Sequence, residues 1–209
     1  MDRKLEKFLE NLSSPEDPVL QDLYRQTYIR FVNPNMVSGH IQGKLLEFIS
    51  SMIRPSKVLE IGTFTGYSAI CLARGLKRGG RLFTTEVNDE LAEFSRSYFK
   101  KAGLDRKIIL LTGRAQEIIP GLDHEFELVY IDGDKREYTE YYRMVIGKVR
   151  TGGFIVADNI LWGGKALEKS SHDPQTQGII EFNEMIRREN GIERLALPFR
   201  DGLLIARKN

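Results

Sequence analysis

The sequence predicts an α/β fold in which a mostly parallel sheet carries helices on both faces. Short apolar strands alternate with amphipathic helices from residue 57 to about residue 157. This alternation is typical of parallel sheets, whose strands are buried on both sides. Near the end of the chain only residues 198–201 separate two further strands. A connection that short joins antiparallel strands, so we expect the sheet to close with a hairpin.

Residues 1–52 are expected to be helical, because apolar residues recur there at helical spacing between breaks near Pro15 and Pro34. The remaining elements follow in order: strands at 58–61, 81–86, 108–111, 127–131, 154–157, 195–197 and 202–206, and helices at 69–76, 90–102, 116–119, 138–149 and 179–186. We therefore expect a single domain over residues 1–209, with a helical N-terminal extension at 1–52 and an α/β core at 57–209.

Composition narrows the class of protein. The 209 residues are 41% hydrophobic, enough for one sizeable core and too few to favour two full domains. A net charge of +2 lacks the strong basicity of a dedicated nucleic-acid binder. The one cysteine, Cys71, excludes an internal disulfide and a cysteine-based zinc cluster. No apolar run is long enough to span a membrane and no signal peptide is recognisable, so we expect a cytoplasmic protein without a membrane partner.

A strand, a glycine-containing turn and a helix follow one another in residues 57–73, and this combination usually holds a small molecule. The spacing of Gly62 and Gly66 does not match the G-x-G-x-x-G pattern of dinucleotide-binding proteins. Glu60, at the end of the strand, would repel a pyrophosphate and suits a ligand with an ammonium or sulfonium group. The alternative is an ordinary strand-to-helix turn that binds nothing.

A second carboxylate narrows the choice of ligand. Glu86 ends the next strand, 24 positions after Gly62, where an acid is placed to bind the hydroxyls of a ribose. A nucleoside that carries a cationic group near Glu60 describes S-adenosylmethionine (SAM).

Three polar residues at the ends of two later strands indicate a metal site. Asp132 follows one strand, and Asp158 with Asn159 follows the next. Because the carboxyl ends of neighbouring parallel strands meet at one edge of a sheet, these side chains are expected to converge. Oxygen ligands without histidine or cysteine suit Mg²⁺, and also Mn²⁺ or Ca²⁺. Taken singly, each residue has an alternative role as a helix cap or turn residue.

Three segments of the sequence, at 58–68, 130–135 and 157–164, together resemble the cation-dependent O-methyltransferases of the caffeoyl-CoA and catechol type. The resemblance extends from about Met36 to Lys208. It implies the class I methyltransferase fold, a Rossmann-like seven-stranded sheet whose last strand is antiparallel. It also implies a SAM cofactor, a divalent cation, a phenolic small-molecule substrate and a homodimer.

The resemblance also assigns roles to individual residues. The cofactor would be held by Met36, Val37, Ser38, Glu60, Gly62, Ser68, Glu86, Ala115, Gln116 and Asp132, with Glu86 on the ribose and Ala115 and Gln116 on the adenine. Asp132, Asp158 and Asn159 would hold the metal. Lys135, supported by Asp132, matches the family's catalytic base. To act as a base Lys135 must lose a proton, which burial and a nearby cation favour. The alternative is a solvated lysine, or one that steers an anionic substrate.

The expected reaction is metal-dependent transfer of a methyl group from SAM to a hydroxyl of a catechol-like or caffeoyl-type molecule. Trp162 and Tyr138 are candidates for an apolar wall against the phenolic ring, with a place in the core as the alternative. The N-terminal helices and residues 163–177 would recognise the outer parts of the substrate. Tyr24, Arg25, Tyr28 and Arg30 are candidates for contacts with an acidic substrate tail or a second subunit. The alternative function is methylation of 5-hydroxyuridine in tRNA, a reaction that the resemblance attributes to some bacterial members; the near-neutral charge argues against it.

Overall fold

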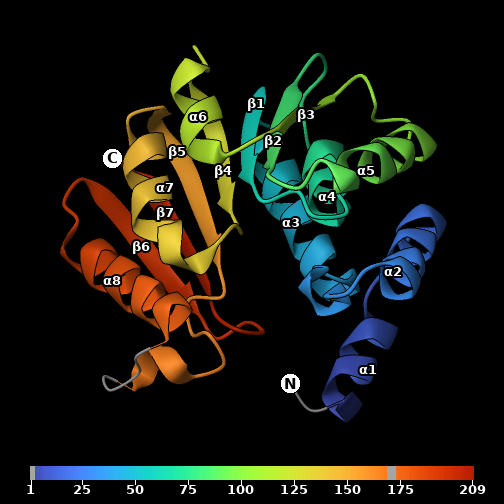
Figure 1. Cartoon of the computed structure of the whole chain (residues 1–209), viewed down its shortest axis with the longest axis horizontal. Helices are drawn as coiled ribbons and strands as arrows, with labels where there is room; N and C mark the ends of the chain where they lie inside the picture. The colour runs from blue at the N-terminus through green and yellow to red at the C-terminus, as the bar shows by residue number, and fades with distance from the viewer. Residues whose placement is uncertain (1–2, 169–172) are drawn as a thin grey trace.

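A seven-stranded sheet, in the order β3-β2-β1-β4-β5-β7-β6, forms the centre of the computed structural model, which describes residues 3–168 and 173–209 (Figure 1). Strands β1 to β5 are parallel, whereas β7 runs antiparallel to both β5 and β6. The strands are β1 (Lys57–Ile61), β2 (Arg81–Glu86), β3 (Ile108–Thr112), β4 (Phe126–Ile131), β5 (Val149–Asp158), β6 (Ile192–Leu197) and β7 (Leu203–Lys208). The predicted α/β fold, including its closing hairpin and antiparallel last strand, is confirmed.

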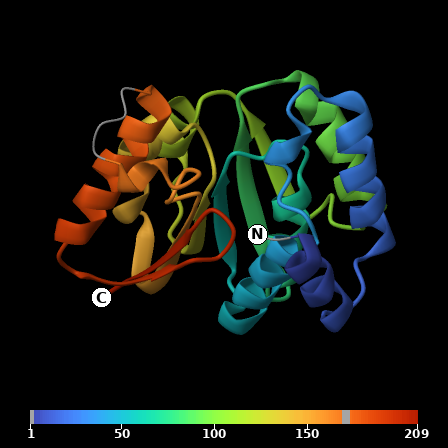
Figure 2. The same cartoon turned by 90° about the horizontal axis from the view of Figure 1, so that it is seen from below.

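Helices cover both faces of this sheet (Figures 1 and 2). Helices α3, α4 and α5 lie on one face, and α7 and α8 lie on the other. The helices are α1 (Arg3–Leu12), α2 (Pro18–Arg30), α3 (His40–Ile53), α4 (Tyr67–Arg74), α5 (Glu90–Lys101), α6 (Ala115–Ile118), α7 (Tyr138–Ile146) and α8 (Pro174–Arg188). No helix of the described chain combines the length and the apolar character that a membrane crossing requires.

The strand sequences explain why helices must pack on both faces of the sheet. In β4, Leu128 and Tyr130 pack into the core beneath α3 and α4, whereas Val129 and Ile131 pack into the core beneath α7 and α8. All four side chains are fully buried. Successive strand residues point to opposite faces, so a continuous apolar run requires apolar partners on both sides.

The boundary between α7 and β5 differs from the prediction. A helix over 138–149 and a strand over 154–157 were expected, but α7 ends at Ile146 and β5 already begins at Val149. Val149 pairs with Phe126, and the register of the two strands then shifts before Leu128. The two glycines of this segment, Gly152 and Gly153, lie between the predicted helix and the predicted strand, and in the fold they belong to an irregular strand that stays in the sheet.

Candidate functional site

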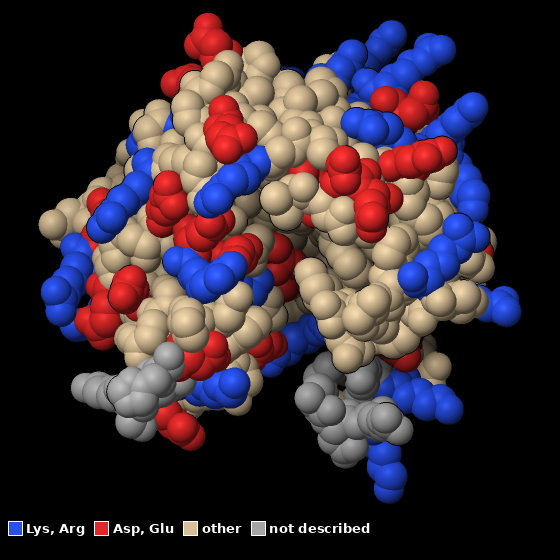
Figure 3. All heavy atoms as spheres, viewed as in Figure 1, with Lys and Arg blue, Asp and Glu red and all other residues tan. Residues whose placement is uncertain are grey.

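A cavity of about 850 Å³ opens at the carboxyl ends of β1, β2, β4 and β5. In the space-filling view it is the hollow near the centre of the molecule, and acidic side chains are visible within it (Figure 3). The residues that line it include these predicted ones: Met36, Val37, Ser38, Gly62, Ser68, Glu86, Ala115, Gln116, Asp132, Lys135, Asp158, Asn159 and Trp162. The tertiary structure therefore gathers most of the predicted site residues around one cavity.

The turn between β1 and α4 lies unusually close to the end of β4. Gly62 has a φ of +99°, and a Cβ at this position would come within 2.3 Å of the carbonyl oxygen of Asp132. The amide nitrogens of Gly62 and Thr63 both donate to the carbonyl oxygen of Thr85, each at 3.1 Å. Glycine is required here on both counts, since other residues rarely adopt this φ and no side chain fits between the two backbones.

Glu60 lies behind the cavity wall and not in it. Its side chain is fully buried, and Thr84 Oγ1 donates to its Oε2 at 2.5 Å. Burial raises the pKa of Glu60 to about 8, against the opposing effect of hydrogen bonds from Ser68 and Thr84. Within the described residues its Oε1 has no hydrogen-bond partner. A buried polar oxygen without a partner is costly, so Glu60 has unused capacity for a hydrogen bond just behind the wall that Ser68 lines.

Glu86 ends β2 at the cavity and holds the turn that follows β1. Its Oε2 accepts from the amide of Phe64 at 2.7 Å, and its Oε1 accepts from the amide of Asn88 at 2.9 Å. Burial raises the pKa of this carboxyl, while the backbone donors counteract the rise. Each carboxylate oxygen can accept a further hydrogen bond, so Glu86 can bind hydroxyl donors without releasing the backbone.

The carboxylates of Asp132 and Asp158 converge, as predicted. The hydroxyl of Tyr130 lies 3.4 Å from Asp132 Oδ2 and 3.1 Å from Asp158 Oδ2. Gln42 also donates to Asp158 Oδ2 through Nε2. Burial raises the pKa of Asp132 to about 6, and the charge of Lys135 opposes this rise. One hydroxyl thus reaches both acids, and both carboxylates line the same part of the cavity.

The loop after β5 supplies the third predicted oxygen ligand. Asn159 and Trp162 have φ values of 57° and 49°, in the left-handed region that residues other than glycine rarely adopt. The amide Nδ2 of Asn159 donates to Asp201 Oδ2 at 3.4 Å, which leaves its Oδ1 as an acceptor. No cluster of three or more histidine, cysteine, aspartate or glutamate side chains occurs among the described residues. The candidate metal site consists of two carboxylates and one amide.

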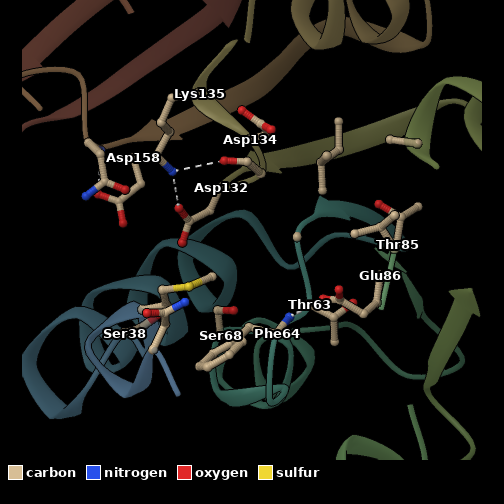
Figure 4. A pocket seen from close by; sticks show the side chains of 18 of the residues that line it. Ser38, Thr63, Phe64, Ser68, Thr85, Glu86, Asp132, Asp134, Lys135 and Asp158 are labelled. Carbon is tan, nitrogen blue, oxygen red and sulfur yellow. Dashed lines mark hydrogen bonds and ion pairs between the residues drawn. The ribbon is translucent and has the colours of Figure 1, made fainter. Parts of the chain in front are cut away.

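Lys135 lies beside this group (Figure 4). Its Nζ donates to Asp132 Oδ1 at 2.8 Å, to the carbonyl of Gly133 at 3.2 Å and to the hydroxyl of Tyr138 at 2.8 Å. Only 7% of the residue is exposed, so the predicted alternative of a solvated lysine is wrong. In Figure 4, Lys135 and Asp158 lie near Asp132 on one side of the cavity, and Glu86 lies on the opposite side.

Tyr138 does not form a wall of the cavity, so its assignment to the substrate is wrong. It is fully buried, and its ring packs edge to face against Phe182, with 5.4 Å between the ring centroids. Its hydroxyl contacts Lys135 and donates to backbone carbonyls, with the oxygen of Asp158 3.0 Å away. The alternative of a core position is confirmed. The hydroxyl supports Lys135 and the backbone of Asp158 from behind the cavity wall. Trp162 does line the cavity.

Three residues that complete the site were missed in the sequence. Gln42 and Arg200 line the cavity, and Tyr130 is buried behind it, where its hydroxyl contacts Asp132 and Asp158. Tyr130 stands two positions before Asp132 and so points to the same side of its strand, a signal that was available. Gln42 and Arg200 reach the site from distant segments, and no local pattern marks them. Tyr24, Arg25, Tyr28 and Arg30 do not line the cavity. Of the segment 163–177, positions 169–172 lie outside the described residues.

Comparison with known proteins identifies the family. A family model described as O-methyltransferase matches residues 10–209. The chain is 36% identical over 170 residues to a catechol O-methyltransferase from Niastella koreensis, covering 79% of this chain and 74% of that protein. It is 28% identical over 215 residues to a caffeoyl-CoA O-methyltransferase from Petroselinum crispum, covering 96% of this chain and 88% of the relative.

A solved structure agrees with these sequence matches. The O-methyltransferase TomG from Streptomyces achromogenes, crystallised in complex with SAM, superposes with a TM-score of 0.94 at 30% sequence identity. The match covers 100% of this chain and 99% of TomG. The predicted resemblance to the catechol and caffeoyl-CoA O-methyltransferases and the predicted class I methyltransferase fold are both confirmed.

Proposed function

The chain belongs to the O-methyltransferase family and is a SAM-dependent methyltransferase, and we propose that it methylates one hydroxyl of a catechol-like small molecule with the help of a divalent cation. The observation that carries the proposal is the convergence of Asp132 and Asp158 on one hydroxyl, next to a buried lysine. Adjacent hydroxyls of a catechol match such an arrangement, because both oxygens can bind one cation.

The residues of the cofactor end fit SAM. Glu86 offers further acceptor capacity at the end of β2, and Glu60, behind the wall, has one oxygen without a hydrogen-bond partner among the described residues. We assign the methionine part of SAM to Met36, Val37, Ser38, Gly62 and Ser68 beside Glu60, the ribose to Glu86, and the adenine to Ala115 and Gln116. We call the part of the cavity that these residues line the cofactor end, and the part lined by Lys135, Asp158 and Asn159 the acceptor end. Asp132 lies between the two.

Asp132, Asp158 and Asn159 fit a hard cation such as Mg²⁺, since all three offer oxygen. A cation held there would lower the pKa of an acceptor hydroxyl. Lys135 Nζ, once unprotonated, takes the proton of that hydroxyl, while Asp132 and Tyr138 keep the nitrogen in position. The acceptor oxygen forms its bond to the methyl carbon as the bond from that carbon to sulfur breaks. The products are a methyl ether and S-adenosylhomocysteine (SAH).

In the experiment, the protein is incubated with labelled SAM and Mg²⁺. One reaction contains a panel of catechols and caffeoyl esters as methyl acceptors, and the other contains unfractionated tRNA. We expect label in the catechols, and EDTA should abolish the transfer. Label that enters only tRNA would overturn the small-molecule proposal, and activity that persists in EDTA would overturn the metal. The catechol and caffeoyl-CoA relatives give the tRNA hypothesis no support.

We also propose that the protein forms a homodimer. Five large apolar residues of the described chain are exposed on the neighbouring helices α1 and α3, with between 48% and 76% of each residue exposed: Leu5, Phe8, Leu12, Phe48 and Met52. Burying such side chains against a second copy would remove them from water. Light scattering should give twice the mass of the chain, and the mass of a monomer would contradict this part of the proposal.

A further inference from the structure

The tip of the β6–β7 hairpin, residues 198–202, is fastened to the loop that carries Asn159 and Trp162. The amides of Ile160 and Leu161 donate to the carbonyls of Gly202 and Asp201, at 3.2 and 3.0 Å. The carboxylate of Asp201 accepts from the amide of Gly163 at 2.6 Å. These bonds fix the tip at the acceptor end of the cavity.

Arg200 occupies this tip in an unusual conformation. Its φ is 50°, in the left-handed region that residues other than glycine rarely adopt. The side chain lines the cavity, where its Nη1 donates to the carbonyl of Ser38 and to Oε1 of Gln42. Gln42 in turn donates to Asp158. The side chain of Gln42 therefore links the guanidinium to Asp158, one of the residues of the candidate metal site.

Arg200 differs in its partners from the other cationic residues of the cavity. Within the described lining, Lys135 pairs with Asp132 at 2.8 Å, Arg114 pairs with Glu137 at 2.8 Å, and Arg136 pairs with Asp134. Among the residues that the structure describes, no carboxylate lies within ion-pair distance of Arg200, and both of its acceptors are neutral oxygens.

The unused donors of Arg200 match an anion. Both of its hydrogen bonds come from Nη1, so Nε and Nη2 have no acceptor among the described residues. A guanidinium presents these N–H groups as a planar fork that pairs with a carboxylate. The bonds to Ser38 and Gln42 hold the fork in place before a ligand arrives, which lowers the entropy lost on binding.

We propose that Arg200 binds an acidic group of the methyl acceptor, so that the preferred substrates are catechols that carry a carboxylate. This inference rests on the proposed function and adds the class of substrate to it. It differs from the sequence prediction, in which contacts with an acidic tail or with a second subunit fell to residues that do not line the cavity: Tyr24, Arg25, Tyr28 and Arg30.

The test compares acids with their neutral methyl esters, which keep the same catechol. We choose 3,4-dihydroxybenzoate and caffeate, because their carboxylates lie at different distances from the ring. The measured quantity is the ratio of kcat/KM for the acid to kcat/KM for its ester. We expect wild type to prefer at least one acid, and Arg200→Gly to lower that ratio about tenfold or more. Glycine also adopts the left-handed φ of this position without strain, so the fold should be retained.

Controls separate recognition of the anion from support of Gln42. Arg200→Lys keeps a charge without the fork and should retain part of the preference. Arg136→Ala removes a cavity cation that already has a carboxylate partner, and the ratio should stay within about twofold of wild type. A role only through Gln42 would lower kcat/KM for acid and ester equally. An unchanged ratio in Arg200→Gly, or a wild type that prefers both esters, would overturn the proposal.

A binding measurement keeps this proposal independent of the reaction. Calorimetry in the presence of SAH and Mg²⁺ gives the Kd of each acid and ester for wild type and for Arg200→Gly. If the Kd for an acid rises in the variant and the Kd for its ester does not, Arg200 recognises the anion even where no catechol is methylated, and only the proposed function fails. Equal changes for acid and ester would overturn the role of Arg200.

Discussion

The cofactor end and the acceptor end of the cavity are held in place by different kinds of contact. At the cofactor end, backbone groups meet: Gly62 packs against the carbonyl of Asp132, and Glu86 is held by the amides of Phe64 and Asn88. At the acceptor end, side chains from α3, β4, β5 and the residues after β4 hold one another, as in the bonds of Gln42 and Tyr130 to Asp158. The cofactor end thus depends on the path of the chain, and the acceptor end depends on individual side-chain atoms.

The largest effect that we expect is a loss of turnover when a side chain of the acceptor end is removed. Lys135→Ala removes the proposed base, and general-base catalysis contributes about 10²- to 10⁴-fold. We expect kcat to fall by a factor in that range while the Kd for SAM, measured by calorimetry, changes little, because every hydrogen bond of Nζ lies at the acceptor end. Lys148→Ala, whose Nζ donates to the carbonyls of Pro120 and Leu122, is the control. Unchanged turnover in Lys135→Ala would remove the base assignment.

The next effect tests the cofactor end through its backbone. In Gly62→Ala the new Cβ would meet Asp132 O at 2.3 Å, so we expect the free energy of unfolding to fall by about 3 kcal/mol, with weakened SAM binding. Gly79→Ala is a matched control, because Gly79 also has a positive φ, of 80°, but a Cβ at that position would have no neighbour within 4 Å. Its loss should be about 1 kcal/mol, from backbone strain alone. Equal losses in urea denaturation would contradict the close approach at Gly62.

A smaller effect concerns a single oxygen atom at the acceptor end. Tyr130→Phe removes the hydroxyl that Asp132 and Asp158 share, and loss of such support typically costs 10- to 100-fold in metal affinity. We expect Mn²⁺ affinity, measured by calorimetry, to fall by about tenfold. Tyr142→Phe removes a buried hydroxyl that has no partner among the described residues, so it should leave Mn²⁺ binding unchanged. Equal affinities in the two variants would show that Tyr130 does not support the site.

The last effect concerns neither turnover nor ligand affinity but the pH dependence of stability in the absence of SAM. Burial raises the pKa of Glu60 from its usual 4.5 to about 8 in the folded protein. Between these values the folded state binds more protons than the unfolded state, so the free energy of unfolding falls as pH rises from about 4.5 to 8. Denaturation at several pH values should show a shallower decline in Glu60→Gln. The same slope in wild type and variant would mean that Glu60 does not titrate in this window.

The sequence by itself determined the sheet, the hairpin and most of the lining of the cavity. Strand-forming runs, the glycine turn and the acids at strand ends are local patterns, and the rule that parallel strands present their carboxyl ends together places them at one edge. It did not determine the start of β5, because glycines such as Gly152 and Gly153 are unfavourable within a strand and Val149 gains its partner, Phe126, only in the fold.

Only the tertiary structure decided how the acceptor end is completed. Gln42 and Arg200 are separated by 158 positions, and their bond exists because the hairpin tip is folded back over the start of α3. Tyr138 and Glu60 lie at the right places in the sequence, yet packing turns one away from the cavity and buries the other behind its wall. Periodicity says which face of an element is apolar, whereas the contacts of one side chain depend on segments that meet only in the fold.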